Sequence, residues 1–121
     1  GPKGTPRVML GPMLGAVRPD GARIWAQVSG PYEVRVVHGD EPELRDARRS
    51  AAVLARAEDD YCVQLELTGL APGREVHYRI EVDGAVDKYL RALPPFRFRT
   101  APSGPARFRV AFGSCARVAY D

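Results

Sequence analysis

The chain has 121 residues, of which 45% are hydrophobic and 27% charged, as is typical of a single globular domain. Its net charge of +3 comes mostly from arginines that are spread along the chain, which argues against a nucleic-acid-binding protein. No apolar run approaches the roughly 20 residues that span a bilayer, so no integral membrane segment is expected. The first residues also lack the apolar stretch of a signal peptide.

Short stretches of alternating apolar residues, separated by turn residues, occupy the chain up to Thr100. Pairs such as Asp20-Gly21 and Asp83-Gly84 tolerate the positive φ of tight hairpins and mark the breaks. Strands are expected at Met13–Val17, Ala22–Val28, Tyr32–His38, Ala51–Ala57, Tyr61–Leu67, Val76–Val82 and Phe96–Thr100. The residues expected to face inward are Ile24, Ala26, Val28, Tyr32, Val34, Val36, Tyr61, Val63, Leu65, Leu67, Val76, Tyr78, Ile80 and Val82.

The second expected strand leaves one question of phase open. Ile24, Ala26 and Val28 share one face of this strand, whereas Trp25 falls on the other. Either both faces of the strand are covered, or a bulge changes its phase.

The segment from Leu44 to Ala57 fits two interpretations. Its Ala, Leu, Arg and Glu residues favour a helix by propensity. Val53, Ala55 and Ala57 alternate, however, as residues of a strand do. We interpret residues 51–57 as a strand and keep a short helix as the alternative.

About seven short strands with regular turn signals, and no alternation of strands with long helices, predict an all-β fold. The expected architecture is an immunoglobulin- or fibronectin type III-like antiparallel β-sandwich covering residues 1–100. Residues 101–106 are rich in Pro, Ser and Gly and are expected to be a linker. Residues 107–121 predict one further strand that ends in the turn Gly113-Ser114-Cys115.

The turn after the fifth expected strand resembles the E–F corner of fibronectin type III domains. Its residues are Leu67–Gly73, followed by the strand that contains Tyr78. Val76 stands where that family has a tyrosine, so Tyr78 is expected to pack in the core rather than to make the family's corner hydrogen bond.

The cysteines and histidines give few chemical signals. Cys62 lies in an expected strand and Cys115 lies beyond the linker, so we expect no disulfide between them. His38 and His77 stand on separate strands without the spacing of metal ligands, and positions facing solvent or at a sheet edge are expected for both. The acidic residues 58–60 are expected to form a solvated turn.

Two pairs of segments at the ends of the chain carry a resemblance to a known family. Gly11–Val17 and Gly21–Gln27 stand near the start, and Phe96–Pro102 and Phe108–Cys115 near the end. In their order and spacing they resemble the PhoD-like (alkaline phosphatase D) family. The resemblance implies a secreted or periplasmic metallophosphoesterase with an N-terminal sandwich followed by a large catalytic domain.

The resemblance also implies a role for Cys115. In that family, the cysteine that closes the first strand of the catalytic domain binds a metal ion, typically iron, with calcium ions nearby, and Cys115 matches this position. A thiolate is a suitable ligand for such a metal, and the metal centre would act on a phosphate ester. Residues 107–121 would then be the truncated beginning of the catalytic domain. We expect the 121-residue chain by itself to be inactive, to hold no metal and to have no catalytic residue of its own.

A second hypothesis belongs to a different class of function. The chain would be a fibronectin-like adhesion or spacer module of an unrelated extracellular protein, and Cys115 would then be inert. A lone cysteine at a strand end is usually a small buried apolar side chain, which is consistent with this hypothesis.

Overall fold

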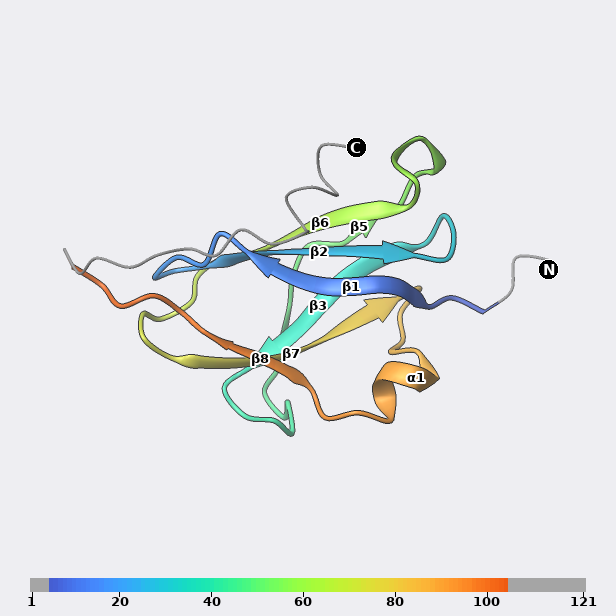
Figure 1. Cartoon of the computed structure of the whole chain (residues 1–121). Helices are drawn as coiled ribbons and strands as arrows, with labels where there is room; N and C mark the ends of the chain where they lie inside the picture. Colours follow the sequence, from blue (N-terminus) through green and yellow to red (C-terminus); the bar gives the residue numbers. More distant parts are fainter. Residues whose placement is uncertain (1–4, 105–121) are drawn as a thin grey trace.

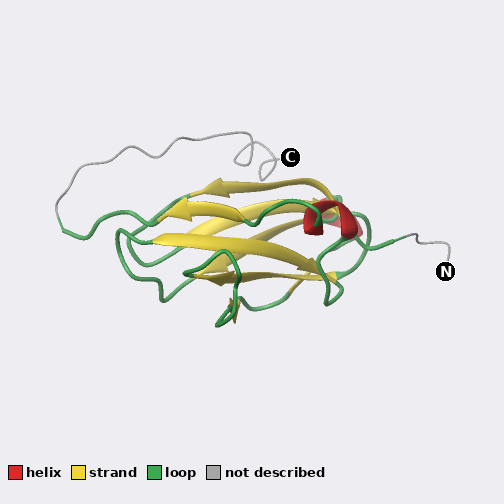
Figure 2. Ribbon diagram, turned by 90° about the horizontal axis from the view of Figure 1, so that it is seen from below, coloured by secondary structure: helices red, strands yellow, loops and turns green. Residues whose placement is uncertain are grey.

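The computed structural model describes residues 5–104, which form two antiparallel β-sheets packed face to face (Figures 1 and 2). The predicted all-β sandwich is therefore confirmed. Its elements are β1 (Val8–Gly15), β2 (Ala22–Val28), β3 (Glu33–Gly39), β4 (Arg48–Arg49), β5 (Val53–Leu54), the 3₁₀ turn η1 (Ala57–Asp59), β6 (Cys62–Leu67), β7 (Glu75–Val82), α1 (Lys88–Arg91) and β8 (Phe96–Arg99). Within these residues no helix is long and apolar enough to cross a membrane.

One sheet has three strands in the order β1-β2-β6, and the other has five strands built around the order β4-β3-β7-β8. The fifth strand, β5, pairs with the same edge of β3 as β4 does, but with its first residues. All strand pairs described are antiparallel. Figure 1 shows β1, β2 and β6 as the upper layer, with β3, β7 and β8 beneath.

The core consists of the inward faces of both sheets, as the alternation predicted. Ile24, Val34, Val36, Leu65 and Ile80 are completely buried. Burying one such side chain contributes roughly 1.5–3 kcal/mol. The remaining buried members of the cluster are Ala22, Ala26, Val28, Ala55, Val63, Leu67, Val76, Tyr78, Val82 and Phe98.

The bulge that could have explained the position of Trp25 lies in β1 and not in β2. β2 keeps a regular register with β6, so Trp25 stays on the outer face, half-buried and opposite Gln64. The irregularity lies in β1, whose register to β2 shifts twice before Met13. Gly11 lies at this irregularity with φ +93°, and a Cβ atom there would come within 2.9 Å of the Trp25 carbonyl oxygen. β1 therefore begins at Val8, before the segment in which alternation is visible.

Residues 44–57 form neither a helix nor one continuous strand. Ser50 interrupts the pairing, because its amide donates to the Val36 carbonyl while its Oγ accepts from the Val36 amide, both at 2.9 Å. This side-chain hydrogen bond replaces a ladder bond and divides the edge into β4 and β5. The helix alternative is wrong, and the predicted strand is correct only for Val53–Leu54.

Tyr78 packs in the core as expected. Its ring lies 5.6 Å from that of Phe96 and 5.9 Å from that of Phe98, between centroids. Burial raises the pKa of the Tyr78 hydroxyl to about 12, so it stays protonated at physiological pH.

The connection between β7 and β8 contains the short helix α1, which the sequence analysis did not predict. The buried Asp87 caps this helix by accepting a hydrogen bond from the Leu90 amide, and its second oxygen accepts from the Val8 amide, both at 2.8 Å. The Arg79 guanidinium donates to the carbonyls of Leu90 and Leu93. These contacts hold α1 beside the end of β7 (Figure 1).

Candidate functional site at the exit end of the sandwich

The last described residues leave the sandwich beside two of its turns. The Ala101 amide donates to the Arg18 carbonyl at 3.2 Å, and the Gly73 amide donates to the Ala101 carbonyl at 3.1 Å. The Leu70 amide donates to the Asp20 carbonyl at 2.9 Å. We call this region the exit end of the sandwich; it comprises residues 18–21, 68–74 and 100–104.

Thr100 joins the end of β8 to the turn between β6 and β7. Its side chain is buried, and its Oγ1 accepts from the Arg74 amide at 2.8 Å and donates to the Ala71 carbonyl at 2.7 Å. The Arg99 guanidinium adds a hydrogen bond to the Gly73 carbonyl at 2.7 Å. Each such bond contributes about 0.5–1.5 kcal/mol, so together they fix the direction in which the chain leaves the domain.

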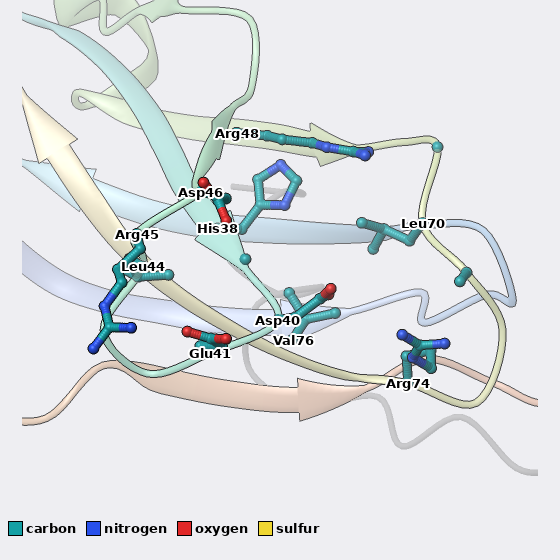
Figure 3. A pocket seen from close by; sticks show the side chains of 13 residues that line it. His38, Asp40, Glu41, Leu44, Arg45, Asp46, Arg48, Leu70, Arg74 and Val76 are labelled. Atoms are coloured by element: carbon teal, nitrogen blue, oxygen red, sulfur yellow. The ribbon is translucent and has the colours of Figure 1, made fainter.

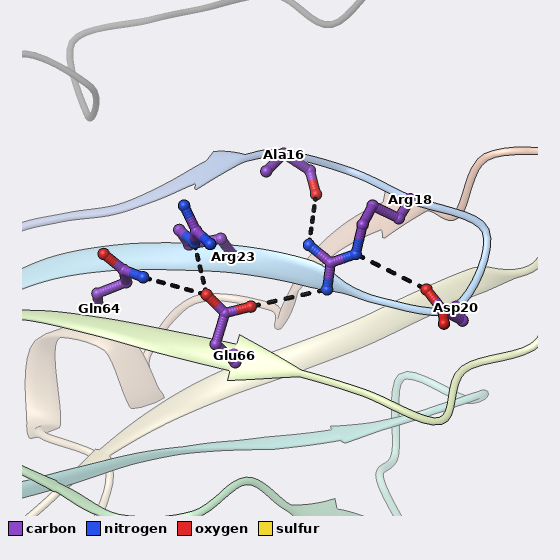
Figure 4. Close-up of polar contacts among 6 residues, drawn as sticks. All are labelled: Ala16, Arg18, Asp20, Arg23, Gln64 and Glu66. Carbon is purple, nitrogen blue, oxygen red and sulfur yellow. Dashed lines mark hydrogen bonds and ion pairs between the residues drawn. The ribbon is translucent and has the colours of Figure 1, made fainter.

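A cluster of charged side chains covers the outer side of the same end (Figure 4). Glu66 accepts hydrogen bonds from Arg23 and Gln64 and pairs with Arg18 at 3.6 Å, and Arg18 also pairs with Asp20 at 3.7 Å. Partial burial alone would raise the pKa of Glu66, but the hydrogen bonds and the two arginine charges lower it. These groups are partly exposed, so they orient the hairpin between β1 and β2 more than they stabilise it.

A pocket of about 310 Å³ opens at this end, between the loop after β3 and the turn before β7 (Figure 3). Its less exposed lining includes His38, Leu44, Leu70 and Val76. The charged side chains around it are Asp40, Glu41, Arg45, Asp46, Arg48 and Arg74. Three cations and three anions thus surround the pocket, which carries no large net charge.

His38 was expected to face solvent or lie at an edge, and this prediction is wrong. The residue is only 5% exposed, because it continues the inward face of Val34 and Val36 and lies between Tyr78 of β7 and Arg48 of β4. Burial and the Arg48 charge lower the pKa of His38, so its ring is neutral at pH 7. A neutral imidazole offers one donor and one acceptor to the pocket.

The same prediction is wrong for His77, which is 8% exposed. It lies on the other face of the sheet, between Gly39 of β3 and Arg97 of β8, so it is not at a sheet edge. Its Nε2 lies 3.4 Å from Glu75 Oε1. The two histidines are thus on opposite faces and do not form one site.

A second hollow, of about 530 Å³, lies at the opposite end, over the outer face of the three-stranded sheet and the edge beside β6. It is lined by Leu10, Trp25, Gln27, Val53, Leu54, Arg56, Glu58, Asp59, Asp60, Cys62, Val63 and Gln64. Cys62 is free, and burial together with the charges of Asp60 and Asp59 raises the pKa of its thiol, so it is protonated at neutral pH.

The predicted metal ligand Cys115 lies outside the described residues, as does the expected strand that precedes it. Between residues 5 and 104, no three His, Cys, Asp or Glu side chains gather to hold a metal ion. The acidic residues 58–60 therefore form no such cluster with other described residues.

The pocket at the exit end was not predicted from the sequence. The loop 39–46 and the turn 69–74 are far apart in sequence, and neither contains a recognised binding motif. One signal was available, since His38 falls in phase with Val34 and Val36 and so belongs to the inward face.

Comparisons with solved structures show which known proteins share this fold. The chain is similar to PhoD, with a TM-score of 0.64, 18% identity and coverage of 78% of this chain and 19% of that chain. It is also similar to the sensor domain of the anti-sigma factor RsgI4 from Pseudobacteroides cellulosolvens, with a TM-score of 0.57, 7% identity and coverage of 91% and 94%. A shorter form of that domain gives a TM-score of 0.55 at 8% identity, with coverage of 82% and 95%. At these identities, the likeness shows the fold.

The family of the protein is shown by its amino-acid sequence. No curated protein matches the chain. Residues 2–102 match the family described as the N-terminal domain of PhoD-like phosphatases. This match includes both segments before residue 28 and the segment ending at Pro102 on which the resemblance rested. Because the match covers most of the chain, the protein belongs to the PhoD-like phosphatase family, of which it contains the N-terminal domain.

Proposed function

We propose that this chain is the non-catalytic N-terminal domain of a PhoD-like phosphatase or phosphodiesterase. Its function would be to support a metal-dependent catalytic domain that hydrolyses phosphate esters. The family match over residues 2–102 is the observation that carries this proposal. The chain spans about a fifth of the length of the solved PhoD chain, which leaves room for a separate catalytic domain.

The exit end suits this supporting role. Thr100 and Arg99 fasten the last strand to the turn 71–74, and Ala101 is hydrogen-bonded to both neighbouring turns. A domain that follows Gly104 would meet these turns first. Because the exit is held by several hydrogen bonds, the following domain would start from a fixed position on the sandwich.

The metal centre would belong to the following domain. The described residues supply no set of ligands, so they do not fit the iron and calcium of the family, and we derive no reaction step from these ions. Cys115 is proposed as one metal ligand on the strength of the family resemblance. A periplasmic or extracellular location, phosphate-ester substrates and contact with the protein's own catalytic domain complete the proposal.

The test uses a longer chain that includes the domain after Gly104. Cys115→Ser is expected to lower bound iron and phosphatase activity together, because it removes one anionic ligand, while the thermal unfolding of the sandwich stays unchanged. Cys62→Ser is the matched control and should leave metal content and activity at the wild-type level, since Cys62 lies in β6. Wild-type iron and activity in the Cys115 variant would show that this cysteine is structural.

A binding or spacer module is the second candidate function. It is favoured by the likeness to the RsgI4 sensor domain, which covers nearly all of both chains, so this sandwich also occurs without a phosphatase domain in the compared chain. The sequence after Asp121 separates the candidates. A strand ending in Gly-Asp followed by Tyr or His favours the phosphatase, and a further sandwich repeat favours the spacer.

A further inference from the structure

The pocket at the exit end is lined by a largely buried histidine, His38, which has no side-chain hydrogen bond within residues 5–104. The residue is only 5% exposed. The ring is therefore available to a ligand that enters the pocket.

Two arginines beside His38 are also available. Arg48 and Arg74 line the pocket, and within residues 5–104 neither guanidinium is in an ion pair. Elsewhere on the domain, arginines such as Arg18, Arg23 and Arg49 pair with glutamates. Figure 3 shows Arg48 above the imidazole and Arg74 across the pocket, whereas Arg45 points away from it. Guanidinium groups in this position suit an oxyanion.

Asp40 adds a requirement that most oxyanions do not meet. Its carboxylate borders the same space as His38 and Arg74 and, like them, has no side-chain partner in the described part of the chain (Figure 3). An anion close to a carboxylate is repelled unless it brings a hydrogen to donate. Hydrogen phosphate brings both features, namely oxygens that accept from arginine and a P–OH group that donates to a carboxylate.

We propose that this pocket binds a phosphate group that carries a P–OH, either free hydrogen phosphate or the singly protonated terminal group of a small phosphomonoester. Arg48 and Arg74 would donate to its oxygens, the His38 N–H would donate to another, and Asp40 would accept the P–OH proton in a hydrogen bond. The volume of about 310 Å³ lies at the small end of ligand sites, which excludes a bulky ester group. The proposal rests on the described residues and does not depend on the proposed function.

The balance of charges around the pocket sharpens this proposal. Three arginines and three acidic side chains surround the pocket, so it does not attract anions through a large net field. Affinity must then come from directed hydrogen bonds, which discriminate between anions of similar size and charge. A site of this kind at the exit end would couple phosphate binding to the turn 69–74, which also holds Thr100.

The experiment titrates the 121-residue chain with sodium phosphate and, separately, with sodium sulfate at equal ionic strength and neutral pH. The His38 ring and the backbone amides of the pocket are followed by NMR, and the affinity is measured by calorimetry. Phosphate is expected to bind saturably, and sulfate at least about tenfold more weakly, because sulfate has no proton to donate to Asp40. Equal binding of both ions, or shifts that do not saturate, would overturn the proposal.

Variants assign the contacts. Arg48→Ala and Arg74→Ala are each expected to weaken phosphate binding at least about tenfold, as loss of a charge-assisted hydrogen bond does. Arg45→Ala is the matched control: it removes the same charge from the rim but points away from the pocket, and should leave the affinity unchanged. Asp40→Asn is expected to abolish the preference for phosphate over sulfate. If Arg45→Ala weakens binding as much as the other two variants, binding is a charge effect and the pocket is not a site.

A further titration distinguishes free phosphate from a phosphomonoester as the ligand of the pocket. Glycerol phosphate, a small monoester, is titrated beside inorganic phosphate at about pH 6, where roughly half of the monoester keeps its P–OH proton. Dimethyl phosphate serves as the control because it has no P–OH group. Binding of the monoester with the affinity of free phosphate assigns the site to ester ligands, and binding of free phosphate alone assigns it to the ion. Binding of dimethyl phosphate as strong as that of phosphate would contradict the role of Asp40.

Discussion

His38 links the packing of the domain to its pocket. The residue occupies the last inward position of β3, where an apolar side chain would complete the core. Arg48, opposite it on β4, places a positive charge beside the ring and adds to the effect of burial on its pKa. Both effects keep the imidazole uncharged, so protonation of this one residue opposes the folded state.

The pH dependence of stability follows from this pKa. Because the pKa of His38 is lowered in the folded state, the unfolded state takes up the proton first as the pH falls below about 6.5. Stability is therefore full above that pH and declines as the pH falls through the interval between the unfolded and folded values. For one proton the slope is at most about 1.4 kcal/mol per pH unit.

His38→Gln tests this assignment, since it keeps a polar side chain but cannot titrate. Urea unfolding between pH 7 and pH 5 is expected to show a smaller loss of stability in the variant than in the wild type. The difference between the two slopes isolates His38 from the carboxylates, which titrate in both proteins. Parallel slopes would mean that His38 accepts a proton in the folded state as easily as in the unfolded chain.

At the scale of elements, α1 exists because of contacts outside its own sequence. Four residues are far too few for a stable isolated helix. Asp87 supplies the N-cap and at the same time accepts from the Val8 amide at the start of β1, and Arg79 satisfies two carbonyls at the helix end. Asp87 thus holds two elements that are distant in sequence.

Asp87→Ala is expected to release both elements together. The amides of Val8 and Leu90 lose their acceptors, so hydrogen exchange should accelerate at both, and stability should fall by about 1–3 kcal/mol. Glu58→Ala, which removes an exposed acidic residue in η1, is the control and should change neither. Faster exchange at Leu90 with unchanged exchange at Val8 would show that the contact to β1 is unimportant.

The same elements show how far the sequence could predict the structure. Segments such as β2, β6 and β7 were predicted well, because a strand with one buried face carries its alternation in the sequence. The start of β1 was not predicted, since the shifts in its register with β2 break the two-residue alternation of buried side chains. α1 depends on tertiary contacts, and β4 and β5 on the Ser50 hydrogen bond, neither of which has a local sequence pattern. The pocket depends on loops that only the fold brings together.

For the whole molecule, the important asymmetry is between its two ends. The exit end holds the pocket, the Thr100 contacts and the charged cluster around Glu66. The opposite end carries η1 and the second hollow, near the ends of β2 and β6. If the domain supports a catalytic domain that follows it, the contact should fall at the exit end, because the chain leaves there in a fixed direction.

Hydrogen exchange can locate this contact by comparing the 121-residue chain with a longer chain that includes the following domain. Peptides from the turns 18–21 and 68–74 are expected to exchange more slowly in the longer chain, because the following domain would cover them and restrain their opening. Peptides from η1 at the opposite end serve as the internal control and should exchange at the same rate in both chains. Protection at η1 without protection at 68–74 would place the contact on the opposite end and refute the supporting role of the exit end. Protection at both turns would also bring the proposed phosphate pocket next to the following domain, since residues 69–71 and Arg74 line it.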